Sequence, residues 1–414
     1  MIMRTRNHPV ITILLAAFLL FAIPAEGHAD DLFRFYPEFQ ASGLGSDNVP
    51  LRTSHEEGDF VGTLVAGFYL DYTSAARYAS LHYDTFAQFF ARQSQYDRAG
   101  EGQYVRGTDD EYLSPTTRLR LDELFYRDSP TVAGIVASEQ APQFNIVAAQ
   151  LLLANDQASI NQVGGQLSHY WGHNWSSELS VHQTTFWNNG GTNNSLNNTS
   201  YDQSVVVSTE YHFAERFSLG LGYRFYDFIF TYPGRPGEQA HWPFVKGSWQ
   251  PLKNLYLSGI VGVVISYTQG TDRQTVNPGG LGLLEYDLQR AHLKVYGGQE
   301  PELTSGIGGA GNIREVRGEL IYDFTQRVNG NVGGGFYESK GTGFDGQLIS
   351  WGFGLGDRVN KWLSLYARFV QVRRNETTNK NFLPTGTENG QEATGNYVVV
   401  GFSVSVEAFR WSWQ

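Results

Sequence analysis

The chain has 414 residues, a formal net charge of −11 and no cysteine. Without cysteine, disulfides, thiolate metal sites, cysteine nucleophiles and covalent c-type haem attachment are all excluded. The acidic balance lacks the clustered basic surface that nucleic acid requires, so we expect no nucleic-acid partner. After residue 29, no apolar run approaches the roughly 20 residues that a membrane-spanning helix needs.

The first 29 residues have the three parts of a secretory signal peptide. Arg4 and Arg6 form a basic start, residues 10–23 form an apolar segment, and Gly27 and Ala29 offer small side chains for cleavage. We therefore expect residues 1–29 to be removed during export and residues 30–414 to form one mature domain.

Eight short polar turns divide the rest of the chain. They lie at residues 71–76, 114–116, 170–174, 212–216, 250–254, 287–290, 323–327 and 357–361. Later turns recur about every 40 residues, enough for two tilted membrane-crossing strands, a tight turn and a longer loop. Longer polar stretches, which we expect to be loops, alternate with the turns at residues 188–200, 233–239, 297–311 and 373–395.

Between the turns, hydrophobicity alternates with a period of two. In residues 217–226 the side chains of one parity are large and apolar, as at Leu219 and Leu221, whereas those of the other are mostly small or polar, as at Ser218 and Gly220. Successive side chains of a strand point to opposite faces, so each run presents one face suited to lipid.

A sheet with a lipid-facing side must close on itself, because hydrocarbon cannot satisfy unpaired edge groups. We therefore predict an all-β fold: a closed antiparallel transmembrane β-barrel with short periplasmic turns and longer extracellular loops. Eight turns supply 16 strands, and terminal strands near residues 33–42 and 396–410 bring the number to about 18. Sixteen strands result if the first segment is only a periplasmic lead-in, and an open soluble sandwich is the rival fold.

Near the C-terminus the alternation changes face. Residues 398–406 alternate in one parity, but Phe409 takes the other. A bulge or a short overhang is therefore expected between Val406 and Phe409.

Three short motifs suggest a family. Residues 36–39 (Tyr-Pro-Glu-Phe), 46–49 (Ser-Asp-Asn-Val) and 112–119 (Tyr-Leu-Ser-Pro-Thr-Thr-Arg-Leu) resemble those of the β-barrel porin type 2 family. That family includes outer-membrane barrels associated with exosortase and exopolysaccharide gene systems. The resemblance implies an outer-membrane barrel linked to export of an extracellular polysaccharide, and it carries over no catalytic residues.

Charged side chains on the polar parity of the strands are the candidate lumen-lining residues. They are His82, Asp84, Arg118, Arg120, Asp122, Glu178, Glu210, Arg224, Lys294, Glu315, Arg317, Glu319 and Arg368. Either these side chains pair across strands and brace a polar interior, or they form a constriction that selects solutes. Their mixed signs argue against sharp selectivity for anions or cations.

The segment at residues 129–156 is poor in charge and contains the apolar run 146–153. We expect it to fold inward as a plug or constriction, although it would also suit packing on the rim or contact with a partner.

Two further motifs are discounted. The glycine-rich residues 306–311 lack the strand and helix of a dinucleotide site, and His169 and His173 lie in a turn, where they do not share a face as zinc ligands.

The predicted function is a porin-like pore or conduit in the outer membrane of a Gram-negative bacterium, for exopolysaccharide export or passive solute diffusion, without catalysis or cofactors. The alternative is a sheath or scaffold barrel around a polysaccharide-export or cytochrome partner. An outer-membrane hydrolase is a third interpretation. His173, His182 and His241 are candidate histidines for its catalytic site, but no nucleophile motif accompanies them. Expected partners are outer-membrane lipid, lipopolysaccharide and the barrel-assembly machinery.

Overall fold

The computed structural model describes residues 31–48, 58–92, 94, 98–127, 158–189, 197–230, 236–271, 274–304, 309–341, 344–378 and 392–412. The expected signal peptide at residues 1–29 and the apolar segment at residues 129–156 lie outside the described residues. Within the described ranges, no helix is long and apolar enough to cross a membrane.

The described chain is built from β-strands that follow one another around a single sheet. They are β1 (Leu32–Ser46), β2 (Asp59–Thr73), β3 (Arg77–Phe90), β4 (Arg98–Ser114), β5 (Thr117–Arg127), β6 (Ala158–Tyr170), β7 (Trp175–Asn189), β8 (Asn197–Ala214), β9 (Phe217–Phe230), β10 (Glu238–Leu252), β11 (Leu255–Thr268), β12 (Gln274–Asp287), β13 (Ala291–Thr304), β14 (Gly309–Asp323), β15 (Val328–Gly341), β16 (Phe344–Arg358), β17 (Leu363–Thr378), β18 (Glu392–Ser405) and β19 (Phe409–Ser412).

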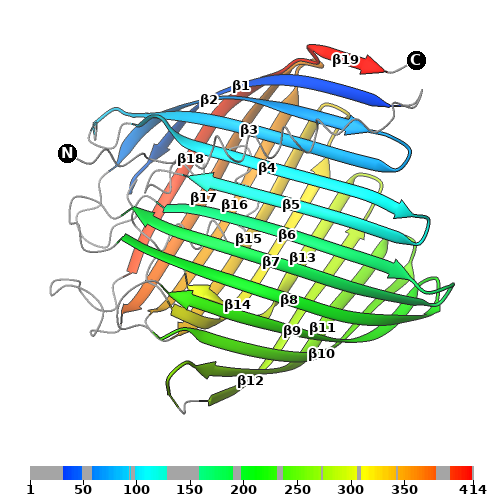
Figure 1. Ribbon diagram of the computed structural model, residues 1–414. Helices are drawn as coiled ribbons and strands as arrows, with labels where there is room; N and C mark the ends of the chain where they lie inside the picture. The colour runs from blue at the N-terminus through cyan, green and yellow to red at the C-terminus, as the bar shows by residue number, and fades with distance from the viewer. Residues whose placement is uncertain are drawn as a thin grey trace, which may run out of the picture.

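The sheet closes into an antiparallel barrel. β1 pairs with β2 on one side and with β18 and β19 on the other. β19 continues β18 along the same neighbour, because Ser405 faces Glu38 and Phe409 faces Phe35. Four steps along the C-terminal strand thus match three along β1, which is the predicted bulge. The wall therefore has 18 strand positions, which confirms the predicted fold (Figure 1).

All eight predicted turns join consecutive strands, and they gather at one end of the barrel (Figure 1). In the third turn, Gly172 has a φ of 84°, a left-handed conformation that glycine adopts without strain. The predicted loops are too long, since residues 188–189, 197–200, 238–239, 373–378 and 392–395 belong to strands, and the loop predicted at residues 297–311 differs most. Residues 297–304 belong to β13 and residues 309–311 to β14, so these strands reach further than their glycine and proline content indicates.

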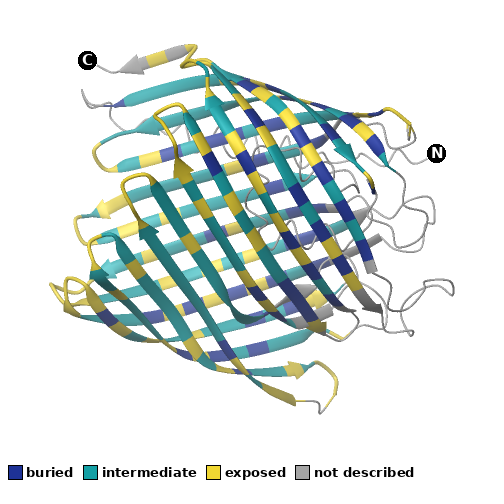
Figure 2. Cartoon of the chain, turned by 180° about the vertical axis from the view of Figure 1, so that it is seen from behind, coloured by how far each residue is buried: buried dark blue, intermediate teal, exposed yellow. Residues whose placement is uncertain are grey.

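The two faces of the wall differ in the way the alternation predicts. Large apolar side chains on the outer face are exposed, including Leu221 at 64%, Val261 at 64% and Val400 at 59%. Their immediate neighbours point inward, which gives the banded pattern along the strands in Figure 2. An outer face of this kind suits hydrocarbon.

The wall folds inward between β8 and β13. Cα atoms of these two strands come within 8 Å of each other, although five inter-strand spacings, roughly 24 Å along the wall, separate them. Interior side chains of β8 to β11 form an apolar core: Val206, Tyr226, Phe228, Ala240, Trp242, Phe244 and Val264. We call β8–β13 the folded-in lobe, and its core occupies space that a round barrel would leave open.

Trp242 is the largest side chain of this core and is fully buried. Its indole lies against two interior glycines of the next strands, Gly262 on β11 and Gly279 on β12. A Cβ atom on Gly262 would lie 2.8 Å from the indole, and one on Gly279 would lie 3.0 Å from it. Because neither glycine has a side chain, the indole ring can pack against the backbone of both strands.

The ladder between β12 and β13 covers only part of both strands. Pairing runs from Gly280 opposite Gln299 to the turn, whereas residues 274–279 pair with β11 alone and residues 300–304 with β14 alone. Pro278 and Pro301 would be the next outward-facing pair, and neither has an N–H to donate. The Gln299 side-chain amide instead donates to the Pro278 carbonyl at 3.1 Å. We call this interrupted ladder the proline seam.

Candidate functional site

The pairing register places all thirteen candidate lumen-lining residues on one face of the wall, opposite the exposed apolar belt. Residues that face each other across each ladder share a side, and the ladder is continuous from β3 to β9 and from β13 to β18. That face is the barrel interior. A role for these residues in transport stays a prediction.

Several candidates form ion pairs with interior partners that the sequence did not single out. The Arg118 guanidinium donates to the Asp110 carboxylate on the neighbouring strand. Lys246 Nζ lies 3.0 Å from Glu210 Oε2, two strands away, and Lys294 Nζ lies 3.0 Å from Glu285 Oε1. Part of the interior charge therefore braces the wall.

Arg224 makes a longer connection. Its Nη1 lies 3.2 Å from Glu300 Oε2, which joins β9 to β13 across the folded-in lobe. The Tyr226 hydroxyl accepts from Arg224 at 2.8 Å and donates to Glu300 at 3.3 Å, and the guanidinium lies over the Trp242 ring at 5.6 Å. We call Arg224, Tyr226 and Glu300 the lobe bridge. The lobe bridge is the polar edge, or rim, of the lobe, and it contacts the apolar core at Trp242.

Outside the folded-in lobe, four neighbouring interior positions of the wall carry no side chain. On β15 and β16, the interior positions Gly333, Gly335, Gly352 and Gly354 lie beside one another in the ladder. We call these four glycines the glycine trough. Among the interior side chains of these two strands, Ser350 faces Gly335 and Asn331 faces Gly354.

Charged and aromatic side chains border the trough. Arg317 and Glu319 on β14 face Gly335 and Gly333; on the other border, Arg368 on β17 faces Gly354. The Arg317 guanidinium lies 4.6 Å from the centre of the Tyr296 ring, and that of Arg368 lies 5.1 Å from the Tyr366 ring. Tyr296 lies on β13, the neighbour of β14 on the side away from the trough, whereas Tyr366 lies on the same strand as Arg368.

Toward the turns, a hollow of about 380 Å³ opens beside the trough. Its lining includes Glu319, Asn329, Asn331, Tyr366 and Arg368. Amides, both signs of charge and a phenol ring together offer donors and acceptors to a hydrated solute, and no single charge dominates the surface.

Sequence reasoning missed interior residues for an identifiable reason. The interior position of Glu300 could not be predicted, because residues 297–311 were expected to form a loop. Side chains of a loop do not alternate between two faces. Lys246 shares the parity of Trp242 and Phe244, so its position was available from the alternation. Glu38 also lies on the interior face of β1, although it was used only as part of a family motif.

The three histidines considered for a hydrolase do not come together. His173 lies in the turn between β6 and β7, His182 points into the interior from β7, and His241 lies on the outer face of β10. There its Nδ1 contacts the Tyr223 hydroxyl at 2.5 Å. The structure offers these three residues no common site.

No known protein family and no curated protein sequence matches the chain, so the resemblance to the type 2 porins stays an expectation. Among solved structures, Pseudomonas aeruginosa OccK2 (OpdF) is 13% identical with a TM-score of 0.46, covering 91% of this chain and 98% of that one. Acinetobacter baumannii OccAB3 is 12% identical with a TM-score of 0.41, covering 90% of this chain and 99% of that one. At such similarity, nothing about function passes from these structures to this chain.

Proposed function

We propose that the protein is an outer-membrane channel through which small polar solutes diffuse passively. The observation that carries the proposal is a closed wall with an apolar outer face and ionisable side chains around its interior. Such a wall is stable in lipid, while its interior suits water and solutes. The predicted signal peptide and the barrel architecture together support placement in the outer membrane.

The folded-in lobe favours small solutes over polymers. Export of an exopolysaccharide and a sheath around a cytochrome both need a lumen wide enough for another macromolecule. The apolar core of the lobe, closed by the lobe bridge, fills part of that width. We therefore place the solute path along the glycine trough, on strands outside the lobe.

The test is conductance of the purified full-length protein in planar lipid bilayers, together with uptake of sugars of graded size by proteoliposomes. We expect stable conductance steps and a sharp upper limit of solute size. Absence of conductance from folded protein would contradict a passive channel, whereas passage of long polysaccharide chains would favour export.

A matched pair of variants tests whether solutes pass along the glycine trough. Gly335 belongs to the trough, and a Cβ there meets its nearest neighbours at ordinary contact distances of 3.6 Å or more, so Gly335→Leu is expected to fold. Gly318 lies on the outer face of the adjacent strand with similar room. We expect Gly335→Leu to reduce conductance at least twofold and Gly318→Leu to leave it unchanged. Equal conductance of both variants would remove the trough from the path.

A further inference from the structure

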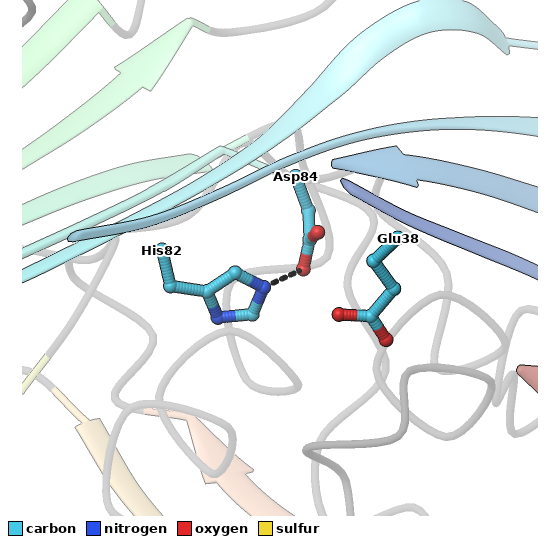
Figure 3. A group of neighbouring side chains, drawn as sticks. All are labelled: Glu38, His82 and Asp84. Carbon is cyan, nitrogen blue, oxygen red and sulfur yellow. Dashed lines mark ion pairs between the residues drawn. The ribbon is translucent and has the colours of Figure 1, made fainter. Parts of the chain in front are cut away.

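A compact group of metal-ligating side chains lies in the barrel interior, away from the trough. Glu38 on β1 and His82 and Asp84 on β3 each offer one ligand atom, and these atoms lie within 4.8 Å of one another. All three residues are buried, with 7% or 8% of their surface exposed. Figure 3 shows the Glu38 carboxylate directed toward the His82 imidazole and the Asp84 carboxylate.

The strand between them makes this meeting feasible. Glu38 and Asp84 both face Gly67 on β2, one from each side. A Cβ atom on Gly67 would collide with Asp84 Oδ1 and with the backbone of β3. Because Gly67 has no side chain, two carboxyl groups two strands apart can approach above it.

The imidazole is held in place by aromatic rings. The Tyr69 ring stacks on the His82 ring with centroids 3.8 Å apart and an angle of 16°. Tyr104 meets the same imidazole edge-on at 5.2 Å. His82 Nε2 lies 2.9 Å from Asp84 Oδ2, so the imidazole edge is turned toward the carboxylates. An oriented imidazole is a prerequisite for a metal ligand.

Two carboxylate oxygens in the group lack hydrogen-bond partners among the described residues. Glu38 Oε1 accepts from Gln40 Nε2 at 2.5 Å, but Glu38 Oε2 and Asp84 Oδ1 are buried without one. Two buried carboxylates this close repel each other, and neither is close to a neutralising arginine or lysine in the ion pairs of the described chain. A single histidine balances at most one of the two charges.

We propose that Glu38, His82 and Asp84 bind one divalent transition-metal ion, for which zinc is the best fit. Imidazole nitrogen and carboxylate oxygen are both ligands that zinc accepts, whereas calcium and magnesium take oxygen ligands. Donors around a tetrahedral zinc lie about 3.3 Å apart, so small side-chain shifts would bring all three onto one ion. Because the ligands join β1 to β3 across β2, the ion would fasten the wall beside the closure of the barrel.

The test uses the full-length protein, folded in detergent micelles and stripped of metal with a chelator. Zinc binding is measured by titration calorimetry and by metal analysis after dialysis. We expect the wild type to bind one more zinc ion than Glu38→Gln, His82→Asn or Asp84→Asn, whose affinity at this site falls more than about 100-fold. Added cobalt is expected to give visible absorption bands that these three variants lose.

His292→Asn is the matched control. His292 and Asp287 form another histidine–aspartate pair, with Nδ1 and Oδ1 2.5 Å apart, but the pair lies exposed at a turn and belongs to no three-ligand group of the described chain. This variant should keep the wild-type zinc stoichiometry.

The shift in gel mobility between heated and unheated protein reports folding of each variant. Equal zinc stoichiometry in the wild type and the three ligand variants, or no zinc bound by the wild type, would overturn the proposal. Neither result depends on conductance.

Discussion

Glu300 combines a negative charge with a position in the polar rim of the folded-in lobe. Its partner Arg224 has 26% of its side chain exposed and Glu300 itself 17%, so both groups are only partly shielded from water. Removal of Glu300 leaves the Arg224 charge beside the Trp242 ring without this ion-pair partner.

We expect Glu300→Gln to lower the free energy of unfolding by about 1–3 kcal/mol, less than for a fully buried pair because of the partial exposure. Glu285→Gln is the control, because its pair with Lys294 is more exposed, at 30% and 48%. It should cost at most about 1 kcal/mol. Urea unfolding in lipid vesicles measures both. Equal losses would mean that the lobe bridge is no more than a surface pair.

Arg317 supports a second prediction at the scale of the residue. It borders the glycine trough, so Arg317→Gln removes positive charge from the proposed path. The reversal potential in a salt gradient should shift toward cations, by a change of about twofold in the permeability ratio. Arg327→Gln removes a charge at an exposed turn, where Arg327 pairs with Asp357, and should change the ratio little. A shift of the same size in both variants would contradict the path.

At the scale of the element, β13 shows how a strand leaves one neighbour while it keeps the other. Pro278 and Pro301 remove two donors at facing positions, so the β12–β13 ladder stops there. β13 nevertheless continues to Thr304 because β14 pairs with it throughout. The proline and glycine content of residues 297–311 thus marked a real interruption, but of one ladder and not of the strand.

Hydrogen exchange tests the proline seam. Residues 274–279 and 300–304 should exchange about ten times faster than residues 280–287, because alternate amides of the seam lack a cross-strand partner. Residues 330–335 of β15 are glycine-rich but paired on both sides, so they serve as a control and should be protected. Uniform protection across β12 would show that the seam is closed in the membrane.

At the scale of the molecule, stability in lipid depends on the difference between the two faces of the wall. Val181 lies near the middle of β7 on the outer face and is 51% exposed, whereas its neighbour Ser180 points inward. The same substitution at these two positions therefore meets hydrocarbon in one case and the interior in the other.

We expect Val181→Arg to destabilise the folded protein in lipid vesicles by about 2–4 kcal/mol, the cost of an arginine near the bilayer midplane. Ser180→Arg should cost clearly less, because its charge remains in the polar interior. Unfolding titrations of the two variants give the comparison. A larger loss for Ser180→Arg would show that the assignment of the faces is wrong.

The family and the substrate could not be predicted with the same success as the architecture. Short motifs such as residues 36–39 suggested the type 2 porins, but no known family matches the chain. Interior residues of a barrel need only be polar and of suitable size, so Arg317 or Glu319 alone does not identify a solute. The meeting of Glu38 with His82 and Asp84 was also missed, because it depends on the order of strands around the closure and on Gly67 between them.

The sequence by itself determined the alternating faces, the positions of the eight turns, the bulge before Phe409 and the closure into about 18 strands. These features are local. The pleat of a strand fixes which side chains share a face, and a tight turn fixes which strand pairs with the preceding one. Only the tertiary structure decided that Arg224 meets Glu300, that β8 approaches β13, and that three ligands meet in the interior. Those contacts depend on how the closed wall bends, and bending is a property of the whole sheet that no short window of sequence contains.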